Sequence, residues 1–243
     1  MIIINRRILI ILILLVILFT GCSQQISPLN KATQQKVHID WVNFVQVNDI
    51  HYSDAHNYCG RDLTSADIDQ KVSEVKFKVS DNVFDTSYKT KDGDAAFLEK
   101  GTPIYSIKGY KPEFRLAAYF NGKLTLYEAD YNPKAKIGGD LIDIRDKVKY
   151  IGINSEEDGR TELAAIKDDN IVKTMVDNFL SADIVDMKNY DLGGTRYFIA
   201  FHLEDGTAIT YSYWIKPRYL ALGVICPLEF QNEIDKAIKK IKK

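Results

Sequence analysis

The chain has 243 residues, with 32 lysines and arginines against 33 aspartates and glutamates. This balance of charge excludes a strongly basic nucleic-acid-binding protein, and three cysteines are too few for a small scaffold held together by disulfides. At 46% hydrophobic and 27% charged residues, the composition is that of a folded protein of one or two domains.

The amino-terminal segment has the pattern of a secretory signal peptide. Arg6 and Arg7 precede twelve consecutive apolar residues, 8–19. A helix of that length spans about 18 Å, short of the roughly 30 Å hydrocarbon core of a membrane. The sequence LFTGC at 18–22 resembles a bacterial lipobox. This resemblance implies cleavage after Gly21 and attachment of lipid to Cys22; the alternative is a membrane anchor that is never cleaved.

A polar tether follows the predicted signal peptide of residues 1–21. Residues 22–36 contain one proline and no apolar periodicity, which is typical of a flexible linker. Two acyl chains on Cys22 are enough for stable membrane anchoring. We therefore expect the mature chain to lie at the extracytoplasmic face of the cell membrane, held there by its lipid anchor.

The mature chain is predicted to form two α+β domains, over residues 37–135 and 140–243. The boundary falls within 131–139, because this stretch contains Pro133 and the pair Gly138-Gly139 and lacks either periodicity.

The first domain is predicted to be rich in strands. The expected strands cover 37–47, 72–79, 104–107, 115–120 and 123–128. Asn121-Gly122 joins the last two as a hairpin, since this pair tolerates the positive φ values of a two-residue turn. The sequence TSAD at 64–67 has the spacing of a helix-capping box, or equally of a polar turn.

The second domain is predicted to have the order β-β-α-β-β-β-α. Its strands are expected within 140–154, over 161–166, 196–203 and 208–215, and around 219–225. One helix begins at Asp168 or Asp169, and the last begins at Pro227. Antiparallel hairpins with helices on one face predict an α+β class of two antiparallel-sheet-based domains, rather than a doubly wound sheet.

Four stretches of the mature chain resemble uncharacterised lipoproteins of Gram-positive, Bacillus-type bacteria. They are residues 75–82 (VKFKVSDN), 92–118, 153–163 and 196–207 (RYFIAFHLEDGT). The resemblance implies a surface lipoprotein, and it supplies no catalytic residues.

One local cluster has the residue types of a zinc site. His51, His56 and Cys59 lie within nine residues, beside Asp49 and Asp54, and zinc favours nitrogen and sulfur ligands. Because the two histidines are five apart, only a loop brings them together. The alternative is a polar surface loop.

Cys59 and Cys226 are the cysteines that remain once Cys22 is lipidated. Outside the cell they could form a disulfide that links the two domains. The alternatives are two unconnected thiols or a catalytic Cys226, since this residue precedes a predicted helix start, where the helix dipole lowers a thiol pKa.

An aromatic cluster near the carboxyl terminus suggests a binding surface. Tyr211, Tyr213, Trp214 and Arg218 could form an exposed platform for a glycan or peptide, because tyrosine and tryptophan give rigid contact area. The alternative is that one face of this strand belongs to the core.

The sequence contains no phosphate-binding glycine loop, nucleophile elbow or metalloprotease motif. We therefore expect a non-catalytic binding module without a cofactor. Its expected partner is an envelope protein or a cell-wall polymer. We also expect it to contact the membrane through its lipid anchor, and we expect no binding to nucleic acid. The alternative is a solute- or metal-binding lipoprotein, and the third possibility is an enzyme without a recognisable motif.

Overall fold

The computed structural model of the chain describes residues 39–55, 61–186, 188 and 190–241. From Ile39 onward the chain groups into one compact unit. The predicted signal peptide, Cys22 and the tether lie outside the described residues, as do His56 and Cys59.

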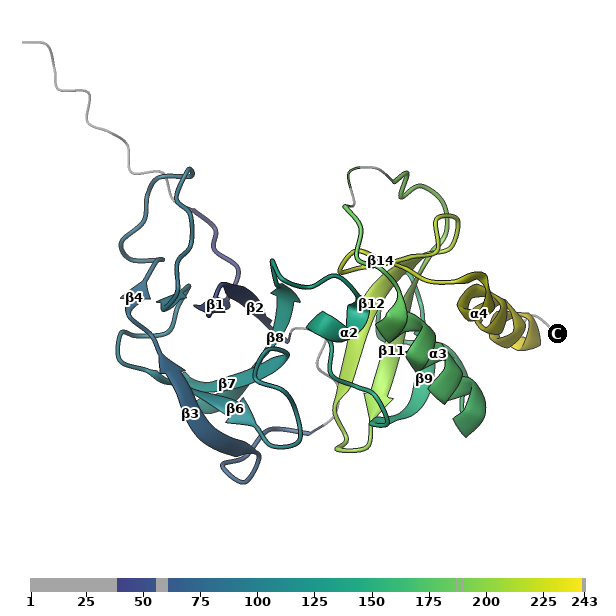
Figure 1. The fold of residues 1–243 in the computed structure, drawn as a ribbon, viewed down its shortest axis with the longest axis horizontal. Helices are drawn as coiled ribbons and strands as arrows, with labels where there is room; N and C mark the ends of the chain where they lie inside the picture. Colours follow the sequence, from purple (N-terminus) through teal and green to yellow (C-terminus); the bar gives the residue numbers. More distant parts are fainter. Residues whose placement is uncertain (1–38, 56–60, 187, 189, 242–243) are drawn as a thin grey trace, which may run out of the picture. The chain divides into compact units, whose positions relative to one another are not determined.

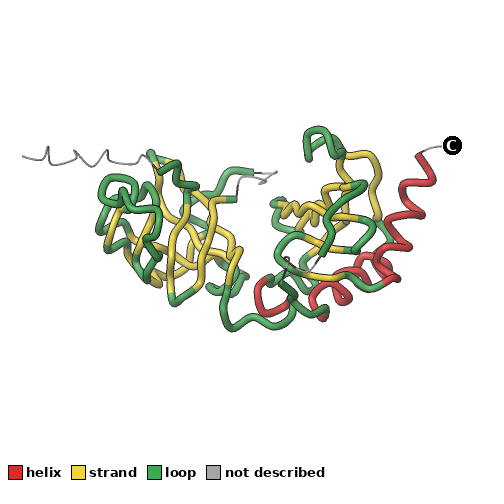
Figure 2. Tube along the Cα trace, turned by 90° about the horizontal axis from the view of Figure 1, so that it is seen from above, coloured by secondary structure: helices red, strands yellow, loops and turns green. Residues whose placement is uncertain are grey.

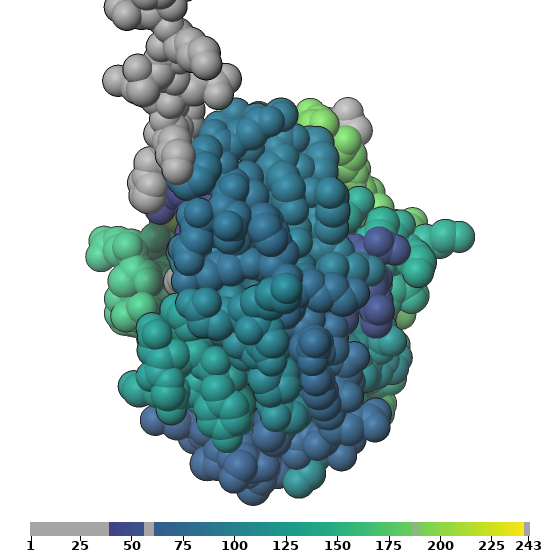
Figure 3. Space-filling view, turned by 90° about the vertical axis from the view of Figure 1, so that its left-hand side faces the viewer, coloured from purple at the N-terminus to yellow at the C-terminus, as the bar shows by residue number. Residues whose placement is uncertain are grey.

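The first half of the compact unit forms a mixed eight-stranded sheet (Figure 1). Its strands are β1 (Phe44–Val47), β2 (Ile50–Asp54), β3 (Ile68–Glu74), β4 (Phe77–Lys78), β5 (Asp94–Ala95), β6 (Pro103–Ile107), β7 (Arg115–Phe120) and β8 (Lys123–Tyr131). They lie in the order β3-β6-β7-β8-β2-β1-β5-β4, and β4 and β5 run parallel. Figure 3 looks onto this side of the molecule, where the surface is coloured blue to teal.

This sheet is curled, because its two edge strands follow one another in the chain. Only Val75 and Lys76 separate β3 from β4. The backbone N–H of Val75 donates to Thr102, next to β6, whereas that of Lys76 donates to Gly93, next to β5. The predicted continuous strand 72–79 is therefore wrong: the chain changes its pairing partner at this corner, and Val75 is buried there.

The second half forms an antiparallel six-stranded sheet with helices on one face (Figure 2). Its elements are α2 (Gly138–Leu141), β9 (Val148–Asn154), β10 (Glu162–Ile166), α3 (Asp169–Ser181), β11 (Arg196–Leu203), β12 (Ala208–Trp214), β13 (Tyr219–Leu220), β14 (Val224–Ile225) and α4 (Leu228–Ile241). The strand order is β10-β9-β11-β12-β13-β14. Helix α3 packs on β9, and α4 packs on β10 and α3.

The α+β class is confirmed, but the prediction of two antiparallel sheets is wrong for the first half, because β4 and β5 run parallel. In the second half the short helix α2 was not predicted. The strand predicted around 219–225 is two short strands, β13 and β14, paired with each other. Leu222 and Gly223 have φ values of 88° and 94°, so the chain turns sharply between β13 and β14. The division into domains at 135–140 stays a prediction.

The pair Gly138-Gly139 belongs to a packed contact rather than to a linker. Both residues begin α2, and a Cβ on Gly138 would lie 2.5 Å from the carbonyl oxygen of Phe179 near the end of α3. Glycine is needed here because two backbones approach closely. Sequence composition alone does not distinguish such a contact from flexibility.

The Asn-Gly turn and the Asp168 cap are confirmed, and residues 64–67 form the polar turn rather than the helix-capping box. Asn121 and Gly122 have φ values of 50° and 78°, as the β7–β8 hairpin requires. Asp168 caps α3 by accepting hydrogen bonds from the backbone N–H groups of Asn170 and Ile171. Residues 64–67 form a polar turn in which Asp67 accepts a hydrogen bond from the backbone N–H of Thr64.

Candidate binding groove

The described part of the predicted zinc cluster is occupied by other contacts. Nδ1 of His51 lies 2.6 Å from a carboxylate oxygen of Asp130, and the ring stacks on Phe44 with 4.9 Å between centroids. Ser53 donates to the same carboxylate. Because His56 and Cys59 lie outside the described residues, the zinc cluster stays a prediction.

Cys226 is completely buried at the start of α4. Burial raises the pKa of its thiol to about 12, so the thiolate nucleophile is scarce near neutral pH. A thiol activated by a helix dipole would instead have a lowered pKa. A disulfide with Cys59 remains a prediction, since Cys59 is not among the described residues.

The predicted aromatic platform is wrong for its tyrosines. Tyr211 and Tyr213 lie on the helix-covered face of β12: Tyr211 packs near Phe179 of α3, and Tyr213 packs on Phe230 of α4. Tyr213 is fully buried, and its hydroxyl donates to Gln231. Strand alternation places Trp214 on the opposite face, so the two kinds of ring do not share a surface.

Arg218, the fourth platform residue, also has a structural contact. Its Nε donates to the carbonyl oxygen of Cys226 at 3.0 Å, and its backbone has a φ of 55°. The guanidinium therefore holds the chain that enters α4. Together with the burial of Tyr213, this leaves Trp214 as a partly exposed ring beside Arg196.

A groove of about 450 Å³ lies on the eight-stranded sheet instead. Its lining comes from the end of β2 (Asp54 and Ala55), from residues 62–65 and from the β7–β8 hairpin. The volume lies within the range of about 300–1,000 Å³ that is typical of small-molecule sites. Leu63, Leu124 and Leu126 of the lining belong to a small apolar cluster beneath it.

The hairpin wall presents an aromatic ring. Tyr119 keeps 45% of its surface exposed, and it pairs with Leu124, so the two side chains lie on the same face of the hairpin. The tight Asn121-Gly122 turn fixes the register of the two strands, so Tyr119 is held on a rigid ribbon rather than on a mobile loop.

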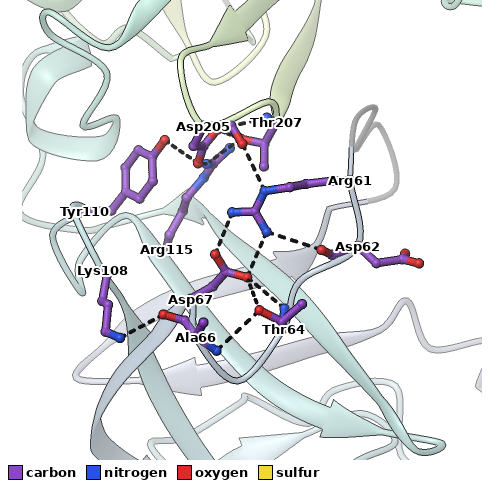
Figure 4. A network of polar contacts seen from close by, with 10 residues as sticks. All are labelled: Arg61, Asp62, Thr64, Ala66, Asp67, Lys108, Tyr110, Arg115, Asp205 and Thr207. Atoms are coloured by element: carbon purple, nitrogen blue, oxygen red, sulfur yellow. Dashed lines mark hydrogen bonds and ion pairs between the residues drawn. The ribbon is translucent and has the colours of Figure 1, made fainter.

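The opposite wall, residues 62–65, is held by an ion pair at its base (Figure 4). Arg61 donates to both carboxylate oxygens of Asp67, and Asp67 also accepts from the hydroxyl of Thr64. The hydrogen bonds from Arg61, with those of Thr64, hold the pKa of Asp67 well below its ordinary value. The carboxylate therefore stays charged and keeps this wall in place.

Arg61 also connects this wall to the six-stranded sheet. Its Nε donates to the carbonyl oxygen of Asp205, in the turn between β11 and β12, at 3.0 Å. The side chain of Asp205 accepts a hydrogen bond from Tyr110 at 2.8 Å and lies 3.7 Å from Arg115 (Figure 4). One turn of the second sheet thus supports the groove wall on the first.

Arg115 is the buried centre of these contacts, with 1% of its surface exposed. It donates to Glu128 at 2.9 and 2.6 Å and to the hydroxyl of Thr207 at 2.9 Å. Its guanidinium lies over the ring of Tyr110, 4.6 Å from the centroid. A buried charge needs such a complete set of partners, because each unmade hydrogen bond would cost free energy.

Burial and the neighbouring charges have opposite effects on the pKa values of Arg115 and Glu128. Burial raises the pKa of Glu128, and Arg115 counteracts this effect. Burial by itself lowers the pKa of Arg115, but Glu128, Tyr110 and Asp205 together outweigh this effect, and the pKa is raised. The two hydrogen bonds to one oxygen of Glu128 favour the ionised pair.

The groove combines groups that recognise hydroxyl-rich ligands. The carboxylate of Asp62 is an acceptor, the hydroxyl of Ser65 donates and accepts, and Tyr119 offers an apolar ring face. Sequence reasoning missed this site, because its walls are far apart in the chain and meet only through sheet pairing. Of the groove, the sequence predicted only the polar turn at 64–67 and the Asn121-Gly122 turn.

No protein-family model, no curated protein and no solved structure matches the chain. In the described part of the chain, no helix is long and apolar enough to cross a membrane. The same residues contain no group of three or more His, Cys, Asp and Glu side chains that could hold a metal ion.

Proposed function

We propose that this chain is a lipid-anchored extracytoplasmic protein that binds a hydroxyl-rich polymer of the cell envelope in the groove of the eight-stranded sheet. The signal peptide and the lipobox ending at Cys22 support the location. The groove supports the binding function, and it is the observation that carries the proposal. The resemblance of four stretches of the sequence to lipoproteins of Gram-positive bacteria supports the location only.

The lining favours a glycan-like polymer over an apolar ligand. Sugars present hydroxyl groups that can donate hydrogen bonds to the carboxylate of Asp62. They also present apolar C–H faces that suit a rigid aromatic ring such as that of Tyr119. The open groove suits a chain that extends beyond the residues in contact, as a wall polymer does.

The location is tested by metabolic labelling with a radioactive fatty acid in a Gram-positive host. The unchanged chain should carry label and sediment with membranes, whereas Cys22→Ser should carry none and be released or remain uncut. Label on the Cys22→Ser variant would overturn the lipid anchor.

The binding function is tested by sedimentation of the detergent-solubilised chain with purified cell-wall sacculi. Tyr119→Ala and Asp62→Asn should each lower the bound fraction at least about fivefold, since each removes a central contact. Tyr131→Ala is the matched control, because Tyr131 is an exposed tyrosine of the same sheet outside the groove. Equal binding by all variants would contradict the groove as the site.

A further inference from the structure

Gly152 occupies an unusual position in the six-stranded sheet. It lies in the middle of β9, paired with Ala200 of β11 and with Ala165 of β10. Strand alternation places it with Tyr150 and Asn154 on the face away from the helices, while Ile151 and Ile153 enter the core. A glycine inside a strand often marks the close approach of a ligand or of another group.

Three polar atoms from three strands converge on the space above this glycine. A Cβ built on Gly152 would lie 2.9 Å from Oε2 of Glu162, 3.2 Å from Nε2 of His202 and 3.3 Å from Oδ1 of Asn154. These residues belong to β10, β11 and β9 respectively. The missing side chain of Gly152 therefore leaves a small space bounded by a carboxylate, an imidazole and an amide.

The side-chain oxygen of Asn154 receives no hydrogen bond from the residues that the structure describes. Asn154 is 6% exposed, and its Nδ2 donates to the carbonyl oxygen of Gly159 at 3.0 Å. That bond fixes the amide so that Oδ1, which is buried, faces the space above Gly152. Such an atom normally costs free energy, so a bound positive charge or donor is the expected partner.

The other two atoms are also electron-pair donors. Glu162 supplies a carboxylate oxygen, and its side chain is 38% exposed. The ring of His202 stacks on Tyr150 at 4.1 Å between centroids. Burial lowers the pKa of His202, although Glu162 opposes the effect. The neutral imidazole has a lone pair available for a metal ion.

We propose that Glu162, His202 and Asn154 bind one divalent transition-metal cation, with zinc as the preferred ion, above Gly152. Nε2 of His202 and Oε2 of Glu162 are 3.7 Å apart. Two zinc ligands at about 2.1 Å in a tetrahedral arrangement lie about 3.4 Å apart, so a small shift of Glu162 would bring these two atoms to the spacing of zinc ligands. The imidazole nitrogen selects zinc over magnesium and calcium, which prefer oxygen ligands alone.

The proposal is tested by isothermal titration of the chelator-treated full chain in detergent micelles with zinc chloride. One zinc ion should bind per chain, with magnesium chloride giving no comparable signal. His202→Gln and Glu162→Gln should each weaken zinc binding at least about tenfold. Asn154→Asp should strengthen it, because the oxygen gains a negative charge, a gain that a merely structural asparagine would not show.

Gly152→Ala fills the space without removing a ligand and should also abolish binding. Glu157→Gln is the matched control, since Glu157 is an exposed glutamate in the turn before β10, and it should bind as the unchanged chain does. Circular dichroism checks the fold of each variant. If Gly152→Ala fails to fold, His202→Gln and Asn154→Asp still decide. Absence of zinc binding, or binding that these variants leave unchanged, would overturn the site.

Discussion

Arg115 is a side chain whose loss should strongly destabilise the folded state. Arg115→Met leaves Glu128 buried without its partner, which typically costs about 3–5 kcal/mol. We expect a loss of this size in the free energy of unfolding at pH 7, measured by urea denaturation. Methionine keeps the apolar length of the side chain, so the effect reports mainly the lost charge and hydrogen bonds.

A second variant separates the ion pair from simple packing. Arg115→Met combined with Glu128→Leu removes both charges, and well-packed apolar replacements of buried pairs are often close to neutral. The double variant should recover more than half of the loss seen for Arg115→Met alone. A loss equal to or larger than the sum of the two single variants would contradict this account.

Asp67 should make stability depend on pH in the acid range. Its folded-state pKa lies below the ordinary 3.8, so its contribution is fully present above that value and is lost as pH falls below it. Asp67→Asn should therefore cost about 1 kcal/mol at pH 7, since Arg61 is partly exposed. Below about pH 4 the difference from the unchanged chain should shrink.

The measurement is thermal or urea unfolding of both proteins between pH 7 and pH 3. Asp69→Asn provides a control, because Asp69 is exposed on the neighbouring β3. If the difference between Asp67→Asn and the unchanged chain stayed constant over this range, the carboxylate of Asp67 would not be the source of the effect.

Helix α3 gives the sharpest prediction for a whole element. Asp168→Ala removes the acceptor for two backbone N–H groups and should lower the free energy of unfolding by about 1 kcal/mol. Asp169→Ala, one position later, should cost less, because Asp169 contributes only its charge near the positive helix end. Urea unfolding of the two variants side by side checks the order of the effects.

The elements that sequence predicted well are those with a local cause. Asp168 caps its own helix, and Asn121-Gly122 supplies its own turn geometry, so neither depends on distant residues. The misplaced elements depend on partners far away in the chain. The break at Val75 reflects a change of pairing strand, and Gly138 is fixed by the end of α3.

The candidate sites follow the same division. The sequence predicted a metal cluster from neighbouring residues, whereas Glu162, His202 and Asn154 meet through the pairing of three strands. Likewise, Tyr213 alternates correctly with Trp214 in β12, but the sequence did not reveal which face the helices cover. Strand pairing and helix placement are properties of the complete fold.

At the scale of the whole molecule, we expect the two sheets to unfold together. One core cluster includes buried residues of both, such as Leu116 and Phe201, and Arg115 of β7 bonds to Thr207 beside β12. Shared burial of this kind couples the two halves. The chain should therefore show one cooperative transition in urea.

The two tryptophans allow a direct measurement. Trp41 lies beside the eight-stranded sheet and Trp214 in the six-stranded sheet. The variants Trp41→Phe and Trp214→Phe each leave one fluorescent reporter. For each variant, the urea midpoint measured by tryptophan fluorescence should equal the midpoint measured by circular dichroism on the same sample. A difference in midpoint between the two variants should then reflect only the effect of each substitution on stability. Separate transitions within one variant would instead support the predicted domain division at 135–140.

The strands at the four sheet edges are built in a way that disfavours aggregation between copies of the chain. β4 and β14 have two residues each, and β3 and β10 carry irregularities in their pairing. Short or bulged edges are poor templates for another chain. Copies held by the proposed lipid anchor would share a two-dimensional layer at high local density, and edges of this kind would keep such neighbours from joining into aggregates.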